Sequence, residues 1–365
     1  MGKDTIKLTR KIQLLIDLPT VEERKEAIGK LYHWRFLCHK AANLIVSHLY
    51  VQEMIQEFFY LSENKKYKLV DEKKDDMGLF NRSRINCTYR MVSDRFKGQM
   101  PTNILTNLNS IILSSFKQNR EEYWNGERSL QNYKKDMGFP FDKEGICGLK
   151  FDPEKKAFCF RFFSIPVKTY LGRAFNDKWE IMQQLADGKL KLCTSHIKLK
   201  DNKTFMLATF EFPKEKHRLR PEVVAEASLS IEYPVVVKIG KHKRTIGTKE
   251  EFLYRRLAIQ AAEQRLRSGM KYTRSGKGAK RKTKVLDRFK NKERNYVNTR
   301  LHKYSRELID FCVKHQAGTL VLMNQEKKIQ IAKAEAFVFR NWSYYDLMTK
   351  IKYKADKAGI ELIVD

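Results

Sequence analysis

The sequence predicts a multidomain α+β fold in which a small barrel-like sheet carries an inserted helical lobe and is followed by an α/β domain. Three observations predict it. The 365 residues are enough for two to three folded units, and 42% of them are hydrophobic, which argues against disorder. Strand-like alternation occurs at residues 4–17 and again over 149–212, with helical periodicity between them. After residue 222, strands alternate with helices.

The first part of the chain predicts one strand and a helical lobe. Residues 4–17 alternate polar and apolar side chains, and this strand ends before Pro19. Apolar positions recur at helical spacing from Val21 to about Phe59. A second helix is expected after Pro101, with an apolar face running from Ile104 to Phe116. The helical segment is therefore an insert between the first strand and those that follow.

Period-two alternation returns at residues 158–163, 189–193 and 197–212. Asp201, Asn202 and Lys203 interrupt the last of these runs, which predicts a hairpin turn. The simplest fold closes strand 4–17 onto these later strands in one sheet. The charged stretch 213–221 predicts a linker that ends this part of the chain.

The remaining segments predict an α/β domain. Residues 228–239 have the composition of a buried strand, and 319–323 and 360–364 of two short ones. Helices are expected at 249–269, 285–315 and 342–358. The chain stops at Asp365, at the end of a strand, so we expect this domain to be truncated.

The charge of the chain indicates its class of partner. Lys and Arg number 73 against 43 Asp and Glu, a net charge of +30. Such an excess repels itself unless a polyanion supplies counter-charge, which leaves nucleic acid or an anionic membrane. No segment approaches the ~20 consecutive apolar residues of a spanning helix, and the N-terminus lacks a secretory apolar core. We therefore expect a cytoplasmic protein with no membrane partner.

The excess charge is concentrated between Lys271 and Arg306, where 14 residues are basic and two are acidic. This run predicts a surface for phosphate groups, with a solvated helix face as the alternative. Ser275 to Gly278 lacks the spacing of a phosphate-binding P-loop and predicts a flexible basic hairpin. The nucleic-acid contacts expected here are Arg274, Lys277, Lys280, Arg281, Lys282, Lys284, Arg288, Lys290, Arg294 and Arg300.

The six cysteines form no C-x-x-C pair, which argues against a structural zinc site and favours reduced thiols. The eight histidines have no ligand-like partner nearby in the sequence, and we assign them no chemistry.

Two segments resemble a known family. The run RNWSYYDL at Arg340–Leu347, continued to Gly359 and Ile360, resembles the final RuvC helix of the miniature type V-F CRISPR effectors and of their TnpB ancestors. The run GERSLQNYK at Gly126–Lys134 resembles the segment that joins their helical lobe to their wedge barrel. The resemblance covers nearly the whole chain in the same order.

The resemblance implies four domains. They are a wedge strand at 1–19, a helical recognition lobe at 20–124, a wedge β-barrel at 125–222 and a RuvC-like domain at 223–365. The last is an RNase H-like α/β domain, here truncated and lacking the zinc-bearing target-nucleic-acid segment.

The family resemblance also implies partners. A bound guide RNA pairs with one strand of double-stranded DNA, and the protein holds the heteroduplex by its backbone and reads only a short adjacent motif. Relatives dimerise on one RNA, so a homodimer is a candidate assembly. The Ile104 to Phe116 face is then either the dimer surface or part of the core of the helical lobe. Arg128 and Lys134 resemble guide-RNA contacts of the family. We expect Arg255, Arg256, Arg265 and Arg267 to line the heteroduplex groove, with a solvent-facing position as the alternative, and Tyr344 and Tyr345 to belong either to the core or to a nucleic-acid wall.

Active relatives cut DNA with three carboxylates that hold two Mg²⁺ ions. In this sequence SIEYP at Ser230–Pro234 stands where the family has G-[IV]-D-[LI]-G, so Glu232 replaces the aspartate of a strand. Met323 replaces the second carboxylate, and thioethers do not hold Mg²⁺. The third carboxylate would lie beyond Asp365. The resemblance thus implies an inactivated nuclease site with no metal or small-molecule cofactor; a substitute site of Glu232, Glu326 and Asp365 is the alternative.

We therefore expect an RNA-guided, non-cleaving DNA-binding protein of the bacterial nucleoid. It would regulate transcription by occupying promoters or by recruiting RNA polymerase through a sigma factor. Two alternatives stay open: a metal-dependent RNA-guided DNA endonuclease completed by another chain, and a general RNA-binding protein.

Overall fold

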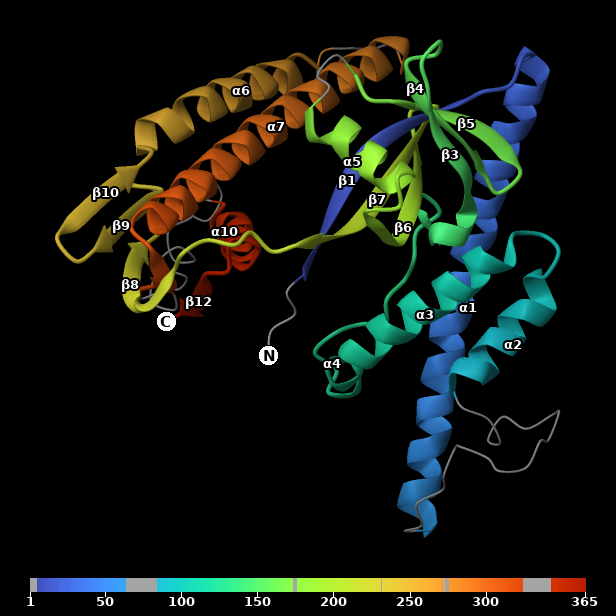
Figure 1. Cartoon of the computed structure of the whole chain (residues 1–365). Coiled ribbons are helices and arrows are strands. Elements are labelled where there is room, and N and C mark those ends of the chain that lie inside the picture. Colours follow the sequence, from blue (N-terminus) through green and yellow to red (C-terminus); the bar gives the residue numbers. More distant parts are fainter. Residues whose placement is uncertain are drawn as a thin grey trace. The chain divides into compact units, whose positions relative to one another are not determined.

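The chain folds into two compact units, seen in a computed structural model that describes residues 5–63, 84–172, 176–230, 232–270, 272, 276–323 and 343–365 (Figure 1). One unit is Lys7–Phe212, and the other is Pro213–Asp365 with Met1–Ile6. The mixed α/β architecture confirms the expected fold class at that level. The division between the units falls at the start of the expected linker 213–221, and the four family-specific domain assignments stay predictions.

The first unit contains a curled sheet of seven strands (Figure 1). In spatial order these are β2 (Phe139–Phe141), β6 (Lys191–Lys200), β7 (Lys203–Pro213), β1 (Thr5–Ile16), β5 (Ile165–Tyr170), β4 (Ala157–Phe162) and β3 (Ile146–Asp152). The pairs β2–β6, β6–β7, β1–β5, β5–β4 and β4–β3 are antiparallel.

Strand β1 lies inside this sheet although it comes first in the sequence. It is placed between β7 and β5, and its register with β5 runs from Gln13 opposite Tyr170 to Ile16 opposite Val167. Ile12 is buried while Lys7 and Lys11 on the same strand are exposed, because successive side chains of a strand point to opposite faces. The expected closing of strand 4–17 onto the later strands is confirmed.

The hairpin between β6 and β7 is also confirmed. Asp201 and Asn202 have φ values of 51° and 57°, in the left-handed region that a type I′ turn requires at both central positions. Lys200 pairs with Lys203 across the turn. Asn and Asp tolerate this conformation better than most residues, which explains why they stand here.

Helices of the first unit form a lobe on the sheet. The lobe consists of α1 (Val21–Glu63), α2 (Arg84–Phe96), α3 (Thr102–Gln118) and α4 (Arg120–Trp124), while a further helix of this unit, α5 (Asn176–Ala186), contacts β3. A capping box starts α1: the Glu23 amide donates to Thr20 Oγ1 and the Thr20 amide to Glu23 Oε2, both at 3.2 Å. The Trp34 ring of α1 contacts Phe163 edge-on at 5.8 Å. Lobe and sheet therefore share one hydrophobic core.

The apolar face of α3 belongs to that core. Its residues from Ile104 to Phe116 include Leu108 and Ile112, which are 2% and 1% exposed. The alternative of a homodimer surface on this face is wrong, because these side chains already pack against α1 and α2 of the same chain.

The second unit contains a five-stranded mixed sheet. Its spatial order is β10 (His242–Ile246), β9 (Val235–Ile239), β8 (Arg220–Ser228), β11 (Ala317–Leu322) and β12 (Glu361–Val364). Strand β11 is parallel to both β8 and β12, while β9 is antiparallel to β8 and β10. Parallel neighbours need long crossover connections, which here contain the helices of the unit.

The single strand expected at 228–239 is wrong, because the chain turns within it. Strand β8 ends at Ser228 and β9 begins at Val235. In the turn, Ser230 Oγ accepts a hydrogen bond from the Tyr233 amide and donates one to the Tyr233 carbonyl, both at 3.1 Å. Pro234 stands at the end of this turn, where its missing N–H removes no ladder bond.

The long helices described in the second unit are α6 (Lys249–Met270), α7 (Gly276–Lys314) and α10 (Tyr344–Ala358). Leu301 and Leu308 of α7 and Leu347 of α10 are fully buried against the sheet. Because α7 begins at Gly276, the expected flexible hairpin at 275–278 overlaps its first turn and is wrong there.

The charged stretch 213–221 forms hydrogen bonds and ion pairs with the end of α10. Lys214 Nζ lies 2.6 Å from Asp356 Oδ1, and the Glu215 amide donates to the Lys357 carbonyl at 2.9 Å. Lys357 Nζ also bonds the Glu215 carboxylate at 2.5 Å, and this hydrogen bond lowers the pKa of Glu215. The linker is therefore an ordered part of the second unit from Lys214 onwards.

Two expectations from composition can be compared with the structure. All six cysteines are free thiols, and Cys38 and Cys312 are buried, as expected for reduced cysteines. Within the described ranges, no helix is both long enough and apolar enough to cross a bilayer.

Candidate nucleic-acid interface

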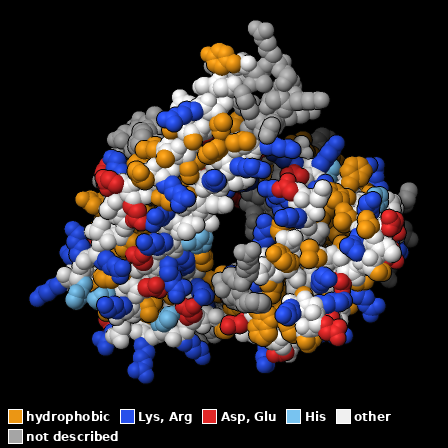
Figure 2. All heavy atoms as spheres, turned by 90° about the horizontal axis from the view of Figure 1, so that it is seen from above, with side chains coloured by type: hydrophobic (Ala, Val, Ile, Leu, Met, Phe, Trp, Pro, Cys, Tyr) orange, Lys and Arg blue, Asp and Glu red, His pale blue; other side chains and the backbone are white. Residues whose placement is uncertain are grey.

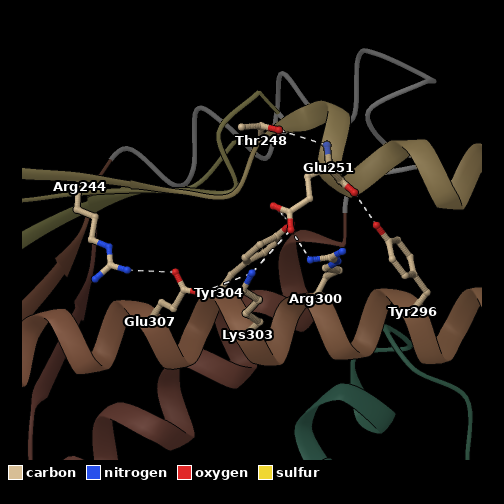
Figure 3. Close-up of polar contacts among 8 residues, drawn as sticks. All are labelled: Arg244, Thr248, Glu251, Tyr296, Arg300, Lys303, Tyr304 and Glu307. Atoms are coloured by element: carbon tan, nitrogen blue, oxygen red, sulfur yellow. Dashed lines mark hydrogen bonds and ion pairs between the residues drawn. The ribbon is translucent and has the colours of Figure 1, made fainter.

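Helices α6 and α7 lie side by side and are joined by a polar clamp around Glu251 (Figure 3). The clamp starts at a capping residue, because the Glu251 amide donates to Thr248 Oγ1 at 3.2 Å just before α6. Thr248 and Glu251 have the spacing of a capping box. The Glu251 carboxylate instead faces α7, where it pairs with Arg300 and lies 3.8 Å from Lys303 Nζ.

Two tyrosines complete the clamp. Tyr296 donates its hydroxyl to the Glu251 carbonyl at 2.5 Å, and the Tyr304 hydroxyl lies 3.5 Å from the Glu251 carboxylate. Burial raises the pKa of Tyr304, whose side chain is 1% exposed. Arg300, expected to contact phosphate, stands beside the Tyr296 ring and in an ion pair with Glu251, so it holds α6 against α7.

Two more of the expected arginines are held by carboxylates. Arg256 Nε lies 2.8 Å from Glu293 Oε1, which also accepts from Gln260 at 2.8 Å, and Arg256 and Glu293 are 12% and 18% exposed. Arg267 pairs with Glu263 one turn earlier on α6 at 2.5 Å. The ion pair of Arg256 with Glu293 is a packing contact between the two helices. Sequence periodicity could not show whether Arg256 faces the other helix or solvent.

The remaining expected cations of these helices whose side chains are described are exposed. They are Arg255, Arg265, Lys284, Arg288, Lys290 and Arg294. Lys and Arg side chains are spread over much of the face drawn in Figure 2 and outnumber the acidic ones. Arg274 lies outside the described residues. Lys277, Lys280, Arg281 and Lys282 are part of α7, but their side chains lie outside the described set.

A cleft of about 670 Å³ lies between α7, α6 and the start of α10. Lys290 and Arg294 line it from α7, and Lys350 lines it from α10. The sequence predicted the first two as phosphate contacts and missed Lys350, which stands outside the basic run. The sequence places Lys350 on a predicted helix, one turn after Asp346. It does not show that this turn of the helix packs against α7.

The other expected contacts are distributed over both units. Arg128 is exposed and closes the turn after α4, with Nη1 3.1 Å from Glu122, and Lys134 is exposed nearby in the sequence. Tyr344 is only 7% exposed and belongs to the core, so a nucleic-acid wall is wrong for it. Tyr345 is 57% exposed, and its ring meets that of Tyr344 edge-on at 5.5 Å.

The carboxyl ends of β8, β11 and β12 meet at one edge of the five-stranded sheet. Leu322 lies opposite Ala227 and Val364, which places Met323 beside Ser228. The Met323 amide donates to the Ala227 carbonyl at 2.9 Å, and the Asp365 amide to the Leu322 carbonyl at 3.0 Å. In sheets with parallel strands, catalytic and ligand-binding residues gather at this edge.

Glu232 lies in the turn between β8 and β9 and not in a strand, which corrects the expectation from its motif. Its side chain is 59% exposed, and its carboxylate pairs with Lys249. The register thus puts Ser228, and not Glu232, beside Met323. The reason is the turn at Ser230 and Pro234, which ends the strand earlier than the composition predicted.

The described residues at this edge do not fit a pair of Mg²⁺ ions. Mg²⁺ requires oxygen ligands. Asp365 has a carboxylate at this edge, whereas Met323 supplies a thioether and the Glu232 carboxylate is bound by an ammonium group. Over the part of the chain that the structure describes, no three His, Cys, Asp or Glu side chains are grouped to hold a metal. Glu326, from the alternative site, lies outside the described residues.

Comparison with known proteins finds relatives that share one name. The chain is 26% identical over 270 residues to the CRISPR-associated endodeoxyribonuclease Cas12f1 of Sulfoacidibacillus thermotolerans, covering 68% of this chain and 62% of that protein. It is 26% identical over 214 residues to the protein of the same name from Syntrophomonas palmitatica, covering 56% and 42%. The chain thus spans less than two thirds of the length of these relatives.

A solved structure has the same fold. It is a Cas12f1–sgRNA–target DNA complex, with a TM-score of 0.69 at 16% identity over 99% of this chain and 89% of that one. No family model matches the sequence. The relatives and the shared fold confirm the resemblance to the miniature type V-F CRISPR effectors that the sequence motifs indicated.

Proposed function

We propose that this protein is an RNA-guided DNA-binding protein that does not cleave its target. The observation that carries the proposal is the edge of the five-stranded sheet, where β8 ends at Ser228 and Met323 follows the last residue of the adjacent parallel strand β11. A hydroxyl and a thioether cannot replace two carboxylates as ligands of Mg²⁺. Loss of cutting, with a strongly basic surface retained, argues for a binding role.

Guide RNA and double-stranded DNA are the proposed partners. A net charge of +30 and the exposed cations of α6 and α7 support a polyanionic partner. Pairing between guide and target strand would supply sequence specificity, while the protein holds the backbone and reads a short adjacent duplex motif. Arg128 and Lys134 remain the proposed guide contacts, and Arg255 and Arg265 are the exposed candidates on α6.

Regulation of transcription follows as the proposed role, because a complex that stays on a promoter without cutting it obstructs RNA polymerase. Recruitment of polymerase through a sigma factor is the second form of this proposal. A homodimer on one RNA also remains a proposal, now without the α3 face as its surface.

An assay on the protein purified together with its co-purifying RNA tests the proposal. The complex is mixed with a plasmid that carries the sequence matching the guide, in Mg²⁺ or Mn²⁺, and both DNA binding and strand breaks are measured. Guide-dependent binding with intact plasmid is expected. Guide-dependent nicking would overturn the proposal and favour the second candidate, a metal-dependent endonuclease completed by another chain, which the names of the relatives support.

Sequencing of the co-purifying RNA separates guided targeting from general RNA binding. A constant scaffold joined to a variable segment is expected for a guided protein. A mixture of cellular transcripts would contradict guided targeting and support a general RNA-binding protein.

A further inference from the structure

The cleft between α7 and α10 collects positive charge from two helices. Its charged residues are Arg256, Lys290, Arg294 and Lys350 against Glu293 and Asp346, four cations and two carboxylates, a balance of +2. The rest of its lining includes the side chains of Ser343 and Asn298, which can donate hydrogen bonds to an anion. The cleft is therefore basic and carries additional polar donors.

Three of these cations have no ion-pair partner in the part of the chain that the structure describes. Arg256 is neutralised by Glu293 at 2.8 Å. Among the described residues, no carboxylate lies within ion-pair distance of Lys290, Arg294 or Lys350. Like charges that face one concave space repel each other, and an anion in that space removes the repulsion.

The two α7 cations of the cleft occupy a defined face of that helix. Lys290 and Arg294 are one turn apart and so lie on one face, as do Lys284 and Arg288. At 3.6 residues per turn the two pairs are about 120° apart around the helix. Lys350 faces the first pair from α10, a helix packed directly on α7. The structure thus separates cations that the sequence treats as one basic run.

We propose that this cleft binds backbone phosphate groups of the nucleic acid, with Lys290, Arg294 and Lys350 as the residues that contact them. The inference rests on the proposed function and adds to it a location and a residue, Lys350, on α10. Because α7 and α10 share a buried core that includes Leu301 and Leu347, the positions of the two helices that carry the cations are fixed relative to each other. The cations are therefore preorganised for a phosphate chain. RNA and DNA present the same phosphate chemistry.

The test compares two variants of equal charge. The cleft variant is Lys290→Gln/Arg294→Gln/Lys350→Gln. The control is Lys284→Gln/Arg288→Gln/Lys352→Gln, which removes three exposed cations of the same two helices that do not line the cleft. Circular dichroism and thermal unfolding check that both variants keep the fold.

Binding of the full chain to a labelled single-stranded RNA and to a DNA duplex of matched length is measured over a salt series. Each lost phosphate contact lowers the slope of log K against log salt by about 0.9 on duplex DNA or 0.7 on a single strand. We expect the cleft variant to lose about two to three units of slope on at least one probe, and the control to lose less than about one. The probe that responds identifies RNA or DNA as the source of the phosphates.

Equal losses of slope in both variants would overturn the inference and leave nucleic-acid binding itself intact. Absence of salt-dependent binding by the unmodified chain to either probe would instead contradict the proposed function together with the inference. Lys290→Arg, which keeps the charge, should retain the slope of the unmodified chain.

Discussion

Lys249 binds Glu232 twice: its ammonium group pairs with the Glu232 carboxylate, and its backbone amide donates to the Glu232 carbonyl at 3.0 Å. Lys249 is the first residue of α6, so the two contacts tie the turn after β8 to the start of that helix. The Glu232 carboxylate is thereby paired with a cation of the protein itself.

We expect the substitution Glu232→Gln to leave DNA binding intact. The pair is 37% and 59% exposed, and exposed ion pairs contribute at most about 1 kcal/mol to stability. We expect guided DNA binding to change less than about twofold, with intact plasmid in both proteins. Unfolding and gel-shift titrations measure the two effects. Cleavage by the unmodified chain that disappears in Glu232→Gln would show that this carboxylate is catalytic.

Glu293→Ala should destabilise the second unit. Glu293 accepts from both Arg256 and Gln260 at 2.8 Å in a contact that is largely buried. Removing the carboxylate takes away the charged group 2.8 Å from the largely buried Arg256 guanidinium, which we expect to cost about 2–4 kcal/mol. Chemical unfolding measures the loss. Asp310→Ala is the matched control, since Asp310 and its partner Arg306 are 57% and 63% exposed and the expected change is below about 0.5 kcal/mol.

Gly318→Ala should disrupt the pairing of β11 with β8. A Cβ atom at Gly318 would lie 2.7 Å from the Arg220 carbonyl oxygen and 2.9 Å from Pro221 Cα, closer than backbone atoms tolerate. The register between these strands shifts at this position, so glycine permits the close approach. We expect a loss of about 1–3 kcal/mol in unfolding free energy. Gly269→Ala, where nothing lies within 4 Å, should be neutral or stabilising; an equal loss in both would contradict the steric argument.

Lys354 should make stability depend on pH. Burial lowers the pKa of Lys354 to about 8 from 10.5, while its Nζ donates to the His302 carbonyl at 2.6 Å and to Ser305 Oγ at 2.8 Å. Between these two values the unfolded chain binds more protons than the folded one, so this group makes stability rise with pH across that window.

The variant Lys354→Met removes the titrating amine and keeps most of the side-chain volume. The difference in unfolding free energy between the unmodified chain and Lys354→Met should shift in favour of the unmodified chain as pH rises through that window. Taking the difference cancels the titration of tyrosines such as Tyr304. A difference that stays constant with pH would contradict the lowered pKa.

Elements with a strong local pattern were predictable. The alternation of residues 4–17, the helical spacing after Val21 and the Asp201–Asn202 turn all correspond to the observed β1, α1 and hairpin. The strand expected at 228–239 failed because a run of apolar residues does not reveal a turn made by Ser230 and Pro234. Because of this turn, Glu232 lies outside a strand.

By itself, the sequence determined the charge of the protein, most of its helices and strands, and the resemblance of its motifs to one family. Only the tertiary structure decided how the cations divide. It turned Arg256 and Arg300 inward to carboxylates and brought Lys350 of α10 to the same cleft as Lys290 and Arg294. The physical reason is that periodicity gives the face of a helix, whereas which face meets a partner depends on packing between segments distant in the chain.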